Sequence, residues 1–146
     1  MKEGILTFIG VVGSFFATIF GGWDSAMITL LIFMGLDYLT GLIVAGVFKK
    51  SPKTENGALE SRAGLKGLIR KGMMLLVVLV ACRLDVVLGS EFVRNAVIIA
   101  FIVNETISII ENAGLMGVPI PSAIKKAIEI LKSKSESDGN ANTGKE

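Results

Sequence analysis

The stretch FVRNAVIIAFIVNETISIIENAGL, residues 92–115, combines two patterns that together constrain how the chain can fold. A helix over this range is about 36 Å long, enough to cross a hydrocarbon core of about 30 Å. Its second half nevertheless carries carboxylates, carboxamides and a hydroxyl, at Asn104, Glu105, Ser108, Glu111 and Asn112. We therefore predict a membrane-spanning helix with polar groups along one side.

The rest of the chain is similarly apolar. Of its 146 residues 51% are hydrophobic and 19% are charged, with a mean hydropathy of +0.66. A soluble domain of this size needs a more polar surface, so the composition indicates a membrane protein. The net charge of +2 gives no support for a nucleic-acid partner. The single cysteine, Cys82, excludes an intrachain disulfide.

Four apolar segments are long enough to cross a membrane, and we predict spans at residues 4–22, 25–48, 72–90 and 92–115. No small-residue cleavage site follows the first segment, so we expect a retained span rather than a signal peptide. The predicted fold class is all-α: a polytopic membrane protein whose transmembrane helical domain covers residues 1–118.

Basic residues collect on one side of this predicted bundle. The loop 49–71 contains seven lysines and arginines, whereas the turns 22–25 and 89–91 contain none. Lysine and arginine favour the cytoplasmic side of a membrane. We predict that loop 49–71 and both termini are cytoplasmic, with Arg94 as an exception on the outer side.

The C-terminal part has a different character. Residues 119–133 place small and aliphatic side chains on one side at helical spacing, which predicts an amphipathic helix. This helix could lie on the inner leaflet, where its lysines would meet anionic lipid, or pack on a partner helix. The polar tail 134–146 is predicted to be disordered.

The polar side chains of the fourth span fall within an arc of roughly 120° on a helix. We call them the polar stripe; its members are Asn104, Glu105, Ser108, Glu111 and Asn112. Two intramembrane carboxylates can cancel the insertion energy of the apolar residues around them, so the stripe favours a helix partner or an aqueous lumen. Alternatively, Glu111 and Asn112 lie in the inner headgroup region, which leaves Glu105 as the costly group.

Further ionisable residues lie inside the predicted spans. Asp37, Arg83 and Asp85 form a candidate intramembrane ion-pair set, because such residues usually face a bundle interior and pair. Arg83 and Asp85 are two residues apart and cannot face each other on a helix, so we predict the pair Asp37 with Arg83. Both a structural pair and a direct role in conduction remain open.

Small residues repeat along the first span. Gly13, Ala17 and Gly21 are four residues apart, a spacing that lets helix backbones approach closely, so we predict a packing face. The chain has no His, no metal-ligand cluster and no nucleophile beside a plausible base. We therefore predict neither catalysis, nor a cofactor, nor a metal.

Three blocks of the sequence resemble a known family. LDYLTGLIVA (36–45), SRAGLKGLIRKGMMLLVVLVACRLD (61–85) and NETISIIENAGLMGVPIPSAIKKAIEILK (104–132) are similar to the phage holins of the toxin-secretion/phage-lysis family, in the family's order. The resemblance implies a small non-enzymatic protein that oligomerises in the bacterial cytoplasmic membrane. Its lesions would let a cytosolic endolysin, or a toxin, escape without direct contact with the holin.

Two other functions fit the same residues. A non-conducting regulator of another holin would oligomerise without permeabilising the membrane. A small proton or ion transporter would use Asp37, Asp85 and Glu105 as a relay, with an inverted repeat between LDYLTG (36–41) and LDVVLG (84–89) as its support.

Overall fold

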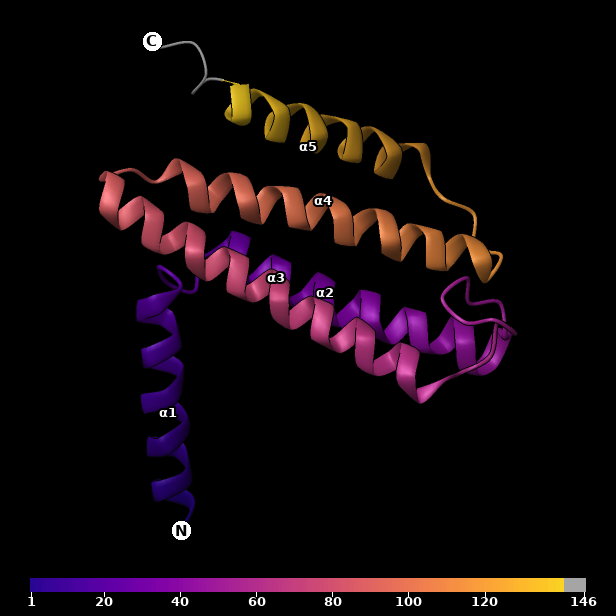
Figure 1. The fold of residues 1–146 in the computed structure, drawn as a ribbon, viewed down its shortest axis with the longest axis horizontal. Helices are drawn as coiled ribbons and strands as arrows, with labels where there is room; N and C mark the ends of the chain where they lie inside the picture. Colours follow the sequence, from indigo (N-terminus) through magenta and orange to yellow (C-terminus); the bar gives the residue numbers. More distant parts are fainter. Residues whose placement is uncertain (141–146) are drawn as a thin grey trace.

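Helices make up nearly all the regular structure of residues 1–140, which the computed structural model describes (Figure 1). In chain order the elements are α1 (Lys2–Ile19), α2 (Ser25–Ile43), the π-helix η1 (Val44–Phe48), α3 (Ser61–Leu88), α4 (Phe92–Leu115) and α5 (Ser122–Asn140). Residues 1–140 contain no strand, so the predicted all-α class is confirmed at this level.

Local signals explain where the helices begin and end. The Asp24 side chain caps α2 by accepting a hydrogen bond of 3.0 Å from the Met27 N–H. Gly89 ends α3 in the left-handed region at φ 64°, where a side chain would be strained. Gly117, at φ 82°, and the proline that follows two residues later prevent α4 from continuing into α5.

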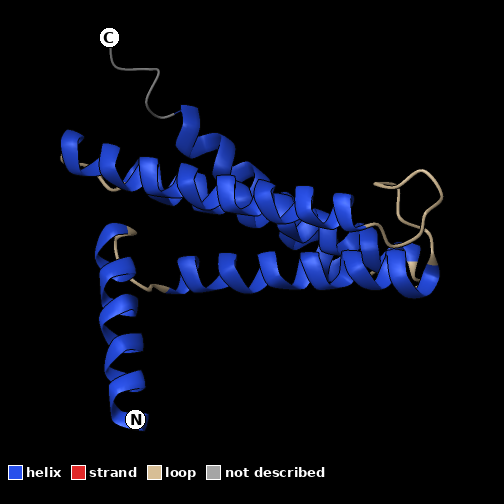
Figure 2. Cartoon of the chain, turned by 60° about the horizontal axis from the view of Figure 1, so that its bottom comes forward, coloured by secondary structure: helices blue, strands red, loops and turns tan. Residues whose placement is uncertain are grey.

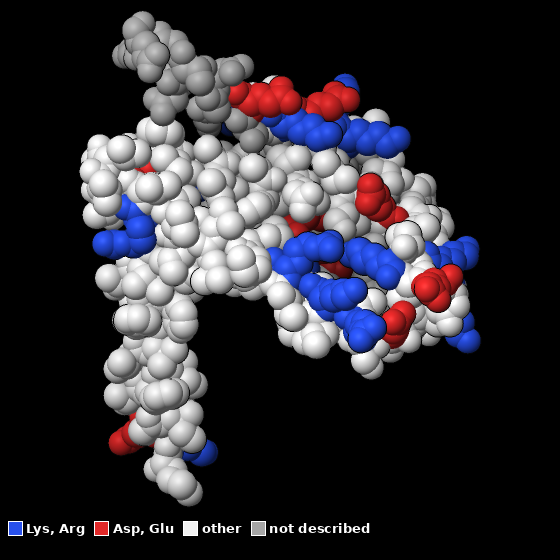
Figure 3. Space-filling view, in the orientation of Figure 1, with Lys and Arg blue, Asp and Glu red and all other residues white. Residues whose placement is uncertain are grey.

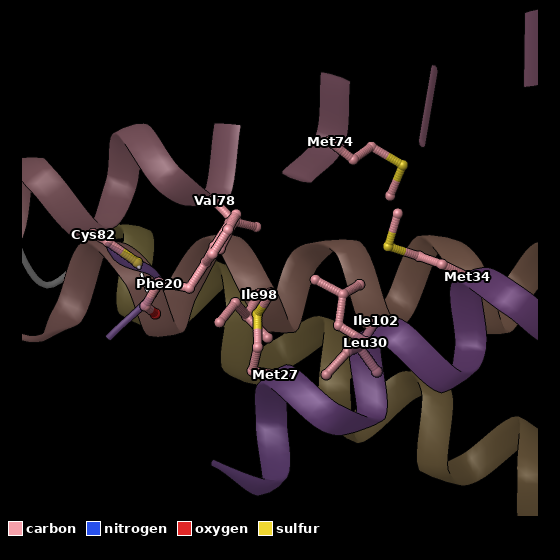
Figure 4. Close-up of a cluster of buried hydrophobic side chains, with 9 residues drawn as sticks. All are labelled: Phe20, Met27, Leu30, Met34, Met74, Val78, Cys82, Ile98 and Ile102. Carbon is pink, nitrogen blue, oxygen red and sulfur yellow. Dashed lines mark hydrogen bonds between the residues drawn. The ribbon is translucent and has the colours of Figure 1, made fainter. Parts of the chain in front are cut away.

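The centre of the molecule is a bundle of α2, α3 and α4. Figure 1 shows α2 and α4 running in the same direction, with α3 antiparallel to both. Figure 4 shows their packed side chains, which recur at helical spacing on each helix, together with Phe20 from the end of α1: Met27, Leu30, Met34, Met74, Val78, Cys82, Ile98 and Ile102. Because lipid is as apolar as these side chains, close packing rather than escape from water holds such a bundle in a membrane.

Helix α1 stands apart from this bundle. Both Figure 1 and Figure 2 show it leaving at a steep angle, and none of its residues is buried. The turn that joins it to α2 contains Gly21 and Gly22, at φ 77° and 99°, which only glycine adopts without strain. Most of the predicted span 4–22 is thus a separate helix in this conformation, outside the bundle of α2, α3 and α4, and residues 20–22 belong to the turn after it.

Within residues 1–140, three helical segments are long and apolar enough to cross a membrane: Lys2–Ile19, Ser25–Phe48 and Phe92–Leu115. The third predicted span lies in α3, which does not meet this description because Lys71, Arg83 and Asp85 fall within its last 18 residues. The length and apolar composition of these three helices indicate a membrane protein. A fourth crossing through α3 stays a prediction.

Two predicted boundaries were wrong. Residues 61–71 are not loop but the first three turns of α3, so the connection after η1 is only residues 49–60. The C-terminal helix begins at Ser122 and continues to Asn140, so the first part of the predicted disordered tail is helical. The charged residues of 61–71 suggested a loop and the polar residues of 134–140 suggested a disordered tail. Charged and polar residues are also compatible with an exposed helix. Residues 141–146 lie outside the described residues.

Candidate functional site

One lysine joins the three helices in the half of the bundle next to the 49–60 connection, which we name the inner half after the predicted topology. Lys71 on α3 donates from Nζ to Asp37 Oδ2 on α2, at 2.7 Å, and to Glu105 Oε2 on α4. The two carboxylates are 6% and 2% exposed, so they would be costly without a cation beside them. This arrangement compensates the buried carboxylate of the polar stripe, Glu105.

The stripe residue Asn112 extends the same network. Its side-chain nitrogen donates to Asp37 Oδ1 at 3.3 Å and to Thr40 Oγ1 at 2.9 Å. A Cβ on Gly41 would lie 3.8 Å from this nitrogen, so the position leaves room for the amide. We call Asp37, Lys71, Glu105 and Asn112 the inner polar cluster.

Beside the cluster lies a cavity of about 320 Å³ between α2, α3, α4 and the 49–60 connection. All five residues of the predicted polar stripe line it, so the structure brings them together. They differ in exposure, because Glu105 and Asn112 are buried in helix contacts while Asn104 and Glu111 are exposed. We call this cavity the inner pocket. Figure 3 shows a hollow at this end of the molecule ringed by lysine and arginine side chains.

A second polar cluster lies at the opposite end of the bundle. Arg94 Nη1 is 2.7 Å from Asp24 Oδ2, and Arg94 Nε donates to the Phe20 carbonyl, also at 2.7 Å. Arg94 Nη2 donates to the Gly22 carbonyl at 3.2 Å. Arg94 thereby ties the start of α4 to the turn between α1 and α2, and this set forms the outer polar cluster.

Asp85 belongs to this outer end as a helix cap. Its side chain accepts hydrogen bonds from the backbone N–H groups of Val93 and Arg94, at 3.0 and 2.8 Å, and from Ser90 Oγ at 2.8 Å. The two backbone N–H groups belong to the first turn of α4, where no carbonyl of the helix itself can accept from them. The helix dipole also favours a carboxylate at this position.

Asp24 lies outside the predicted spans, and the hydrogen bond from Arg94 lowers the pKa of its carboxyl below the usual 3.8. A lowered folded pKa contributes stability above the unfolded value that is lost as pH falls through the folded value. We therefore expect Asp24→Asn to be less stable than wild type at neutral pH, with the difference shrinking as the pH falls below 3.8 and lost once the pH is below the lowered pKa of the folded protein. Because the Asp24 side chain is 49% exposed, the effect should be under about 1 kcal/mol.

Thermal unfolding of both proteins in detergent micelles across this pH range measures the effect. The carboxylates of the inner cluster titrate in both, so only the difference between the two curves reports on Asp24. A difference that stays constant with pH would show that Asp24 is not an ionised partner of Arg94.

The predicted pair of Asp37 with Arg83 was wrong. Arg83 is exposed, and Asp37 binds Lys71, which lies twelve residues earlier on α3, or about 18 Å along the helix. The error followed from assigning Lys71 to a loop, which removed it from the candidates. Asp85 also takes no part in the predicted set, because it caps α4 instead.

The predicted packing face of α1 is only partly helical. Gly21 follows the helix, in a turn where a Cβ would lie 3.0 Å from Arg94 Nε, so its smallness makes room for arginine. Gly13 and Ala17 do lie on α1, and a Cβ on Gly13 would meet no atom within 4 Å. Their packing against another copy of the chain stays a prediction.

The sequence analysis missed the cationic members of both clusters. Lys71 carried no signal beyond its position at the edge of an apolar segment. For Arg94 a signal existed, because Asp24 and Arg94 were both placed on the outer side by the predicted topology. A buried arginine there needs an acidic partner, and Asp24 was the carboxylate in the neighbouring turn.

Comparison with known proteins finds a matching family and relatives in bacteria and in a phage. The model of the bacteriophage holin family matches residues 14–133. An uncharacterised 14.9 kDa protein of Clostridium perfringens is 44% identical over 138 residues, covering 90% of this chain and 98% of the relative. A Bacillus phage phi105 protein named "Probable holin" is 33% identical over 117 residues, covering 77% of this chain and 81% of that protein. No solved structure matches.

Proposed function

Because the chain belongs to the bacteriophage holin family, we propose that it oligomerises in the bacterial cytoplasmic membrane and opens lesions through which a cytosolic endolysin escapes. The resemblance also allows the release of a toxin through the same lesions. The endolysin need not touch this protein, since a sufficiently wide lesion only has to let it pass. No catalytic step is part of this proposal.

We place loop 49–60 and both termini in the cytoplasm and the outer polar cluster on the far side. The charge pattern of α3 supports a crossing there, because residues 72–82 are uncharged between Lys71 and Arg83. Lys71 is neutralised by its two partners, and the exposed Arg83 can extend toward the outer headgroups. For α1 to cross as well, it must rotate about Gly21 and Gly22.

The observation that carries the proposal is the position of Lys71 between two carboxylates of different helices. It keeps the most costly part of the polar stripe away from lipid while the chain is a closed bundle. A lesion needs polar groups facing water, and α4 has them on one side and isoleucines on the other. We propose that opening separates α4 from Lys71 and turns the stripe toward a lumen shared by several copies.

The closed bundle gives the transporter alternative little support. Asp37 and Asp85, the matching residues of the two supposed repeats, have unrelated surroundings: one binds Lys71 and the other caps a helix. A non-conducting regulator differs from a holin in its effect on cells, so an experiment in bacteria separates the two.

Expression of the full chain in bacteria tests the function directly. We expect expression alone to stop growth and abolish the membrane potential, and co-expression with a cytosolic endolysin to clear the culture. The controls are endolysin alone and the protein with an inactive endolysin, neither of which should lyse cells. Loss of potential without endolysin escape would indicate a narrow channel, and no loss of potential would indicate a regulator.

A further inference from the structure

We propose that the inner pocket binds the headgroup of phosphatidylglycerol from the inner leaflet. The inference rests on the membrane placement given above, which puts this end of the bundle at the cytoplasmic face. The proposal goes beyond the membrane placement by assigning a specific lipid-binding site. The site consists of two cations, one unpaired hydroxyl and several polar side chains that line a single cavity.

The cations are Lys53 on the 49–60 connection and Arg70 on α3. Both line the pocket, and neither forms an ion pair with any side chain that the structure describes. The third cation in the lining, Lys71, is already shared by two carboxylates. Lys53 and Arg70 therefore remain for a phosphate, to which arginine can donate two parallel hydrogen bonds.

A hydroxyl group in the same lining lacks a partner. The Thr54 Oγ1 atom is shielded from solvent and makes no hydrogen bond within the described residues. A buried polar atom of this kind is destabilising unless something satisfies it. Lys53 and Thr54 are neighbours in the chain and both line the pocket, so we expect a phosphate bound at the lysine to lie near this hydroxyl.

The remaining polar groups favour a headgroup that carries hydroxyls. Asn104, Ser108 and two carboxylates, Glu60 and Glu111, also line the pocket, and the carboxylates accept hydrogen bonds but repel a second negative charge. Phosphatidylglycerol has one phosphate charge and a terminal diol that can donate to such a carboxylate. Its headgroup therefore matches a cavity whose lining holds both cations and carboxylates outside the three ion pairs.

Apolar side chains near the pocket suit the acyl part of a lipid. Leu59, beside the pocket, is 59% exposed, and Leu65, Leu68 and Ile69 are also exposed on the turns of α3 that line it. Exposed aliphatic groups next to unpaired basic residues are typical of a segment at the boundary between headgroups and hydrocarbon.

Lipid retention by the purified full chain tests the site. The protein is placed in phosphatidylcholine nanodiscs that contain a minor fraction of phosphatidylglycerol, transferred to detergent, and its retained lipid is measured by mass spectrometry. We expect enrichment of phosphatidylglycerol over the bulk ratio. Lys53→Gln with Arg70→Gln should lower this enrichment by about fivefold for each cation removed.

Two further variants separate the pocket from general surface charge. Thr54→Val removes a buried hydroxyl that has no partner in the protein, so it should keep the helicity and maintain or raise the thermal stability while lowering the enrichment by about twofold to tenfold. Lys125→Gln with Lys126→Gln removes the same charge from exposed positions of α5 and should have no effect. Soluble glycerol phosphate should fail to displace the lipid.

The proposal is overturned if wild type shows no enrichment, or if Thr54→Val retains phosphatidylglycerol as wild type does. It is also overturned if the α5 variant loses as much enrichment as the pocket variant, or if glycerol phosphate displaces the lipid completely. None of these results concerns lysis, which is measured separately in cells. A protein that retains phosphatidylglycerol but does not release endolysin would contradict the proposed function and leave the site in place.

Discussion

Lys71→Met should destabilise the closed bundle by about 3 to 5 kcal/mol and bring lysis forward in time. Methionine keeps the length of the side chain but removes the cation that Asp37 and Glu105 share. Both carboxylates are then buried beside each other without compensation. Their lowest-energy alternative is water, which they reach when α4 leaves α3, so the same change that weakens the closed bundle should favour the open lesion.

The measurement combines thermal unfolding of the purified protein with the onset of lysis in cells that express endolysin, at matched amounts of protein in the membrane. Arg83→Met is the matched control, because Arg83 lies on the same helix but is exposed and pairs with no acidic side chain among those that the structure describes. The triple variant Lys71→Met, Asp37→Asn, Glu105→Gln should restore much of the stability, since it leaves no buried charge. Normal stability and normal lysis time for Lys71→Met would show that the inner cluster does not hold the bundle closed.

Glu105→Leu should have the opposite effect on lysis. A carboxylate at the middle of a span opposes insertion by about 2.5 to 3.5 kcal/mol, whereas leucine favours it by about 0.3 to 0.6 kcal/mol. The variant should therefore accumulate in the membrane as a stable bundle, with Lys71 still paired to Asp37. It should lyse cells late or not at all, because α4 has lost the buried carboxylate of the stripe.

Glu105→Gln separates polarity from charge at this position. Glutamine still hydrogen-bonds to water, so this variant should insert and lyse cells, and with Glu111→Gln it should reduce the preference of the lesion for cations. The measurements are membrane accumulation by immunoblot, time of lysis, and ion selectivity of the purified protein in planar bilayers. Lysis by Glu105→Leu on the wild-type schedule would contradict an aqueous role for the stripe.

The helical class and the position of the polar stripe could be predicted from the sequence for a physical reason. The length of an apolar segment decides whether a helix can cross a membrane. The spacing of the five polar residues within 104–112 places them on one side of a helix, whichever helices pack around it. That part depends only on local geometry, and the structure gathers all five stripe residues around one pocket.

Pairing across helices depends on details that local patterns do not contain. Tyr38 packs against Gly64 and Gly67, and its hydroxyl donates to the Gly64 carbonyl at 3.3 Å, which helps to set the register of α3 against α2. That register brings Lys71 rather than Arg83 to Asp37. Nothing in the spacing of the charges predicts it, because helix α3 begins inside a segment whose basic residues look like a loop.

The steep angle of α1 has a similar origin. Its composition is that of a span, and its length is sufficient, but its direction is set by the backbone of two glycines after it. Arg94 then fixes that turn by binding the carbonyls of Phe20 and Gly22. A sequence pattern can predict that the turn exists, whereas its direction depends on these tertiary contacts.

The central claim is that the polar stripe is packed against the bundle before lysis and faces water afterwards. It is tested most directly by the rate at which N-ethylmaleimide, which crosses membranes, modifies single cysteines at Ser108 and Asn112 in a Cys82→Ala background that still lyses cells. Each rate is divided by that of a cysteine at Glu55 in the exposed connection, and Ile99→Cys, on the side of α4 opposite the stripe and outside the bundle core, is the reference. We expect the ratio at positions 108 and 112 to rise sharply at lysis while that at Ile99 stays low. Ratios at 108 and 112 that remain unchanged in cells from which endolysin has escaped would contradict the account.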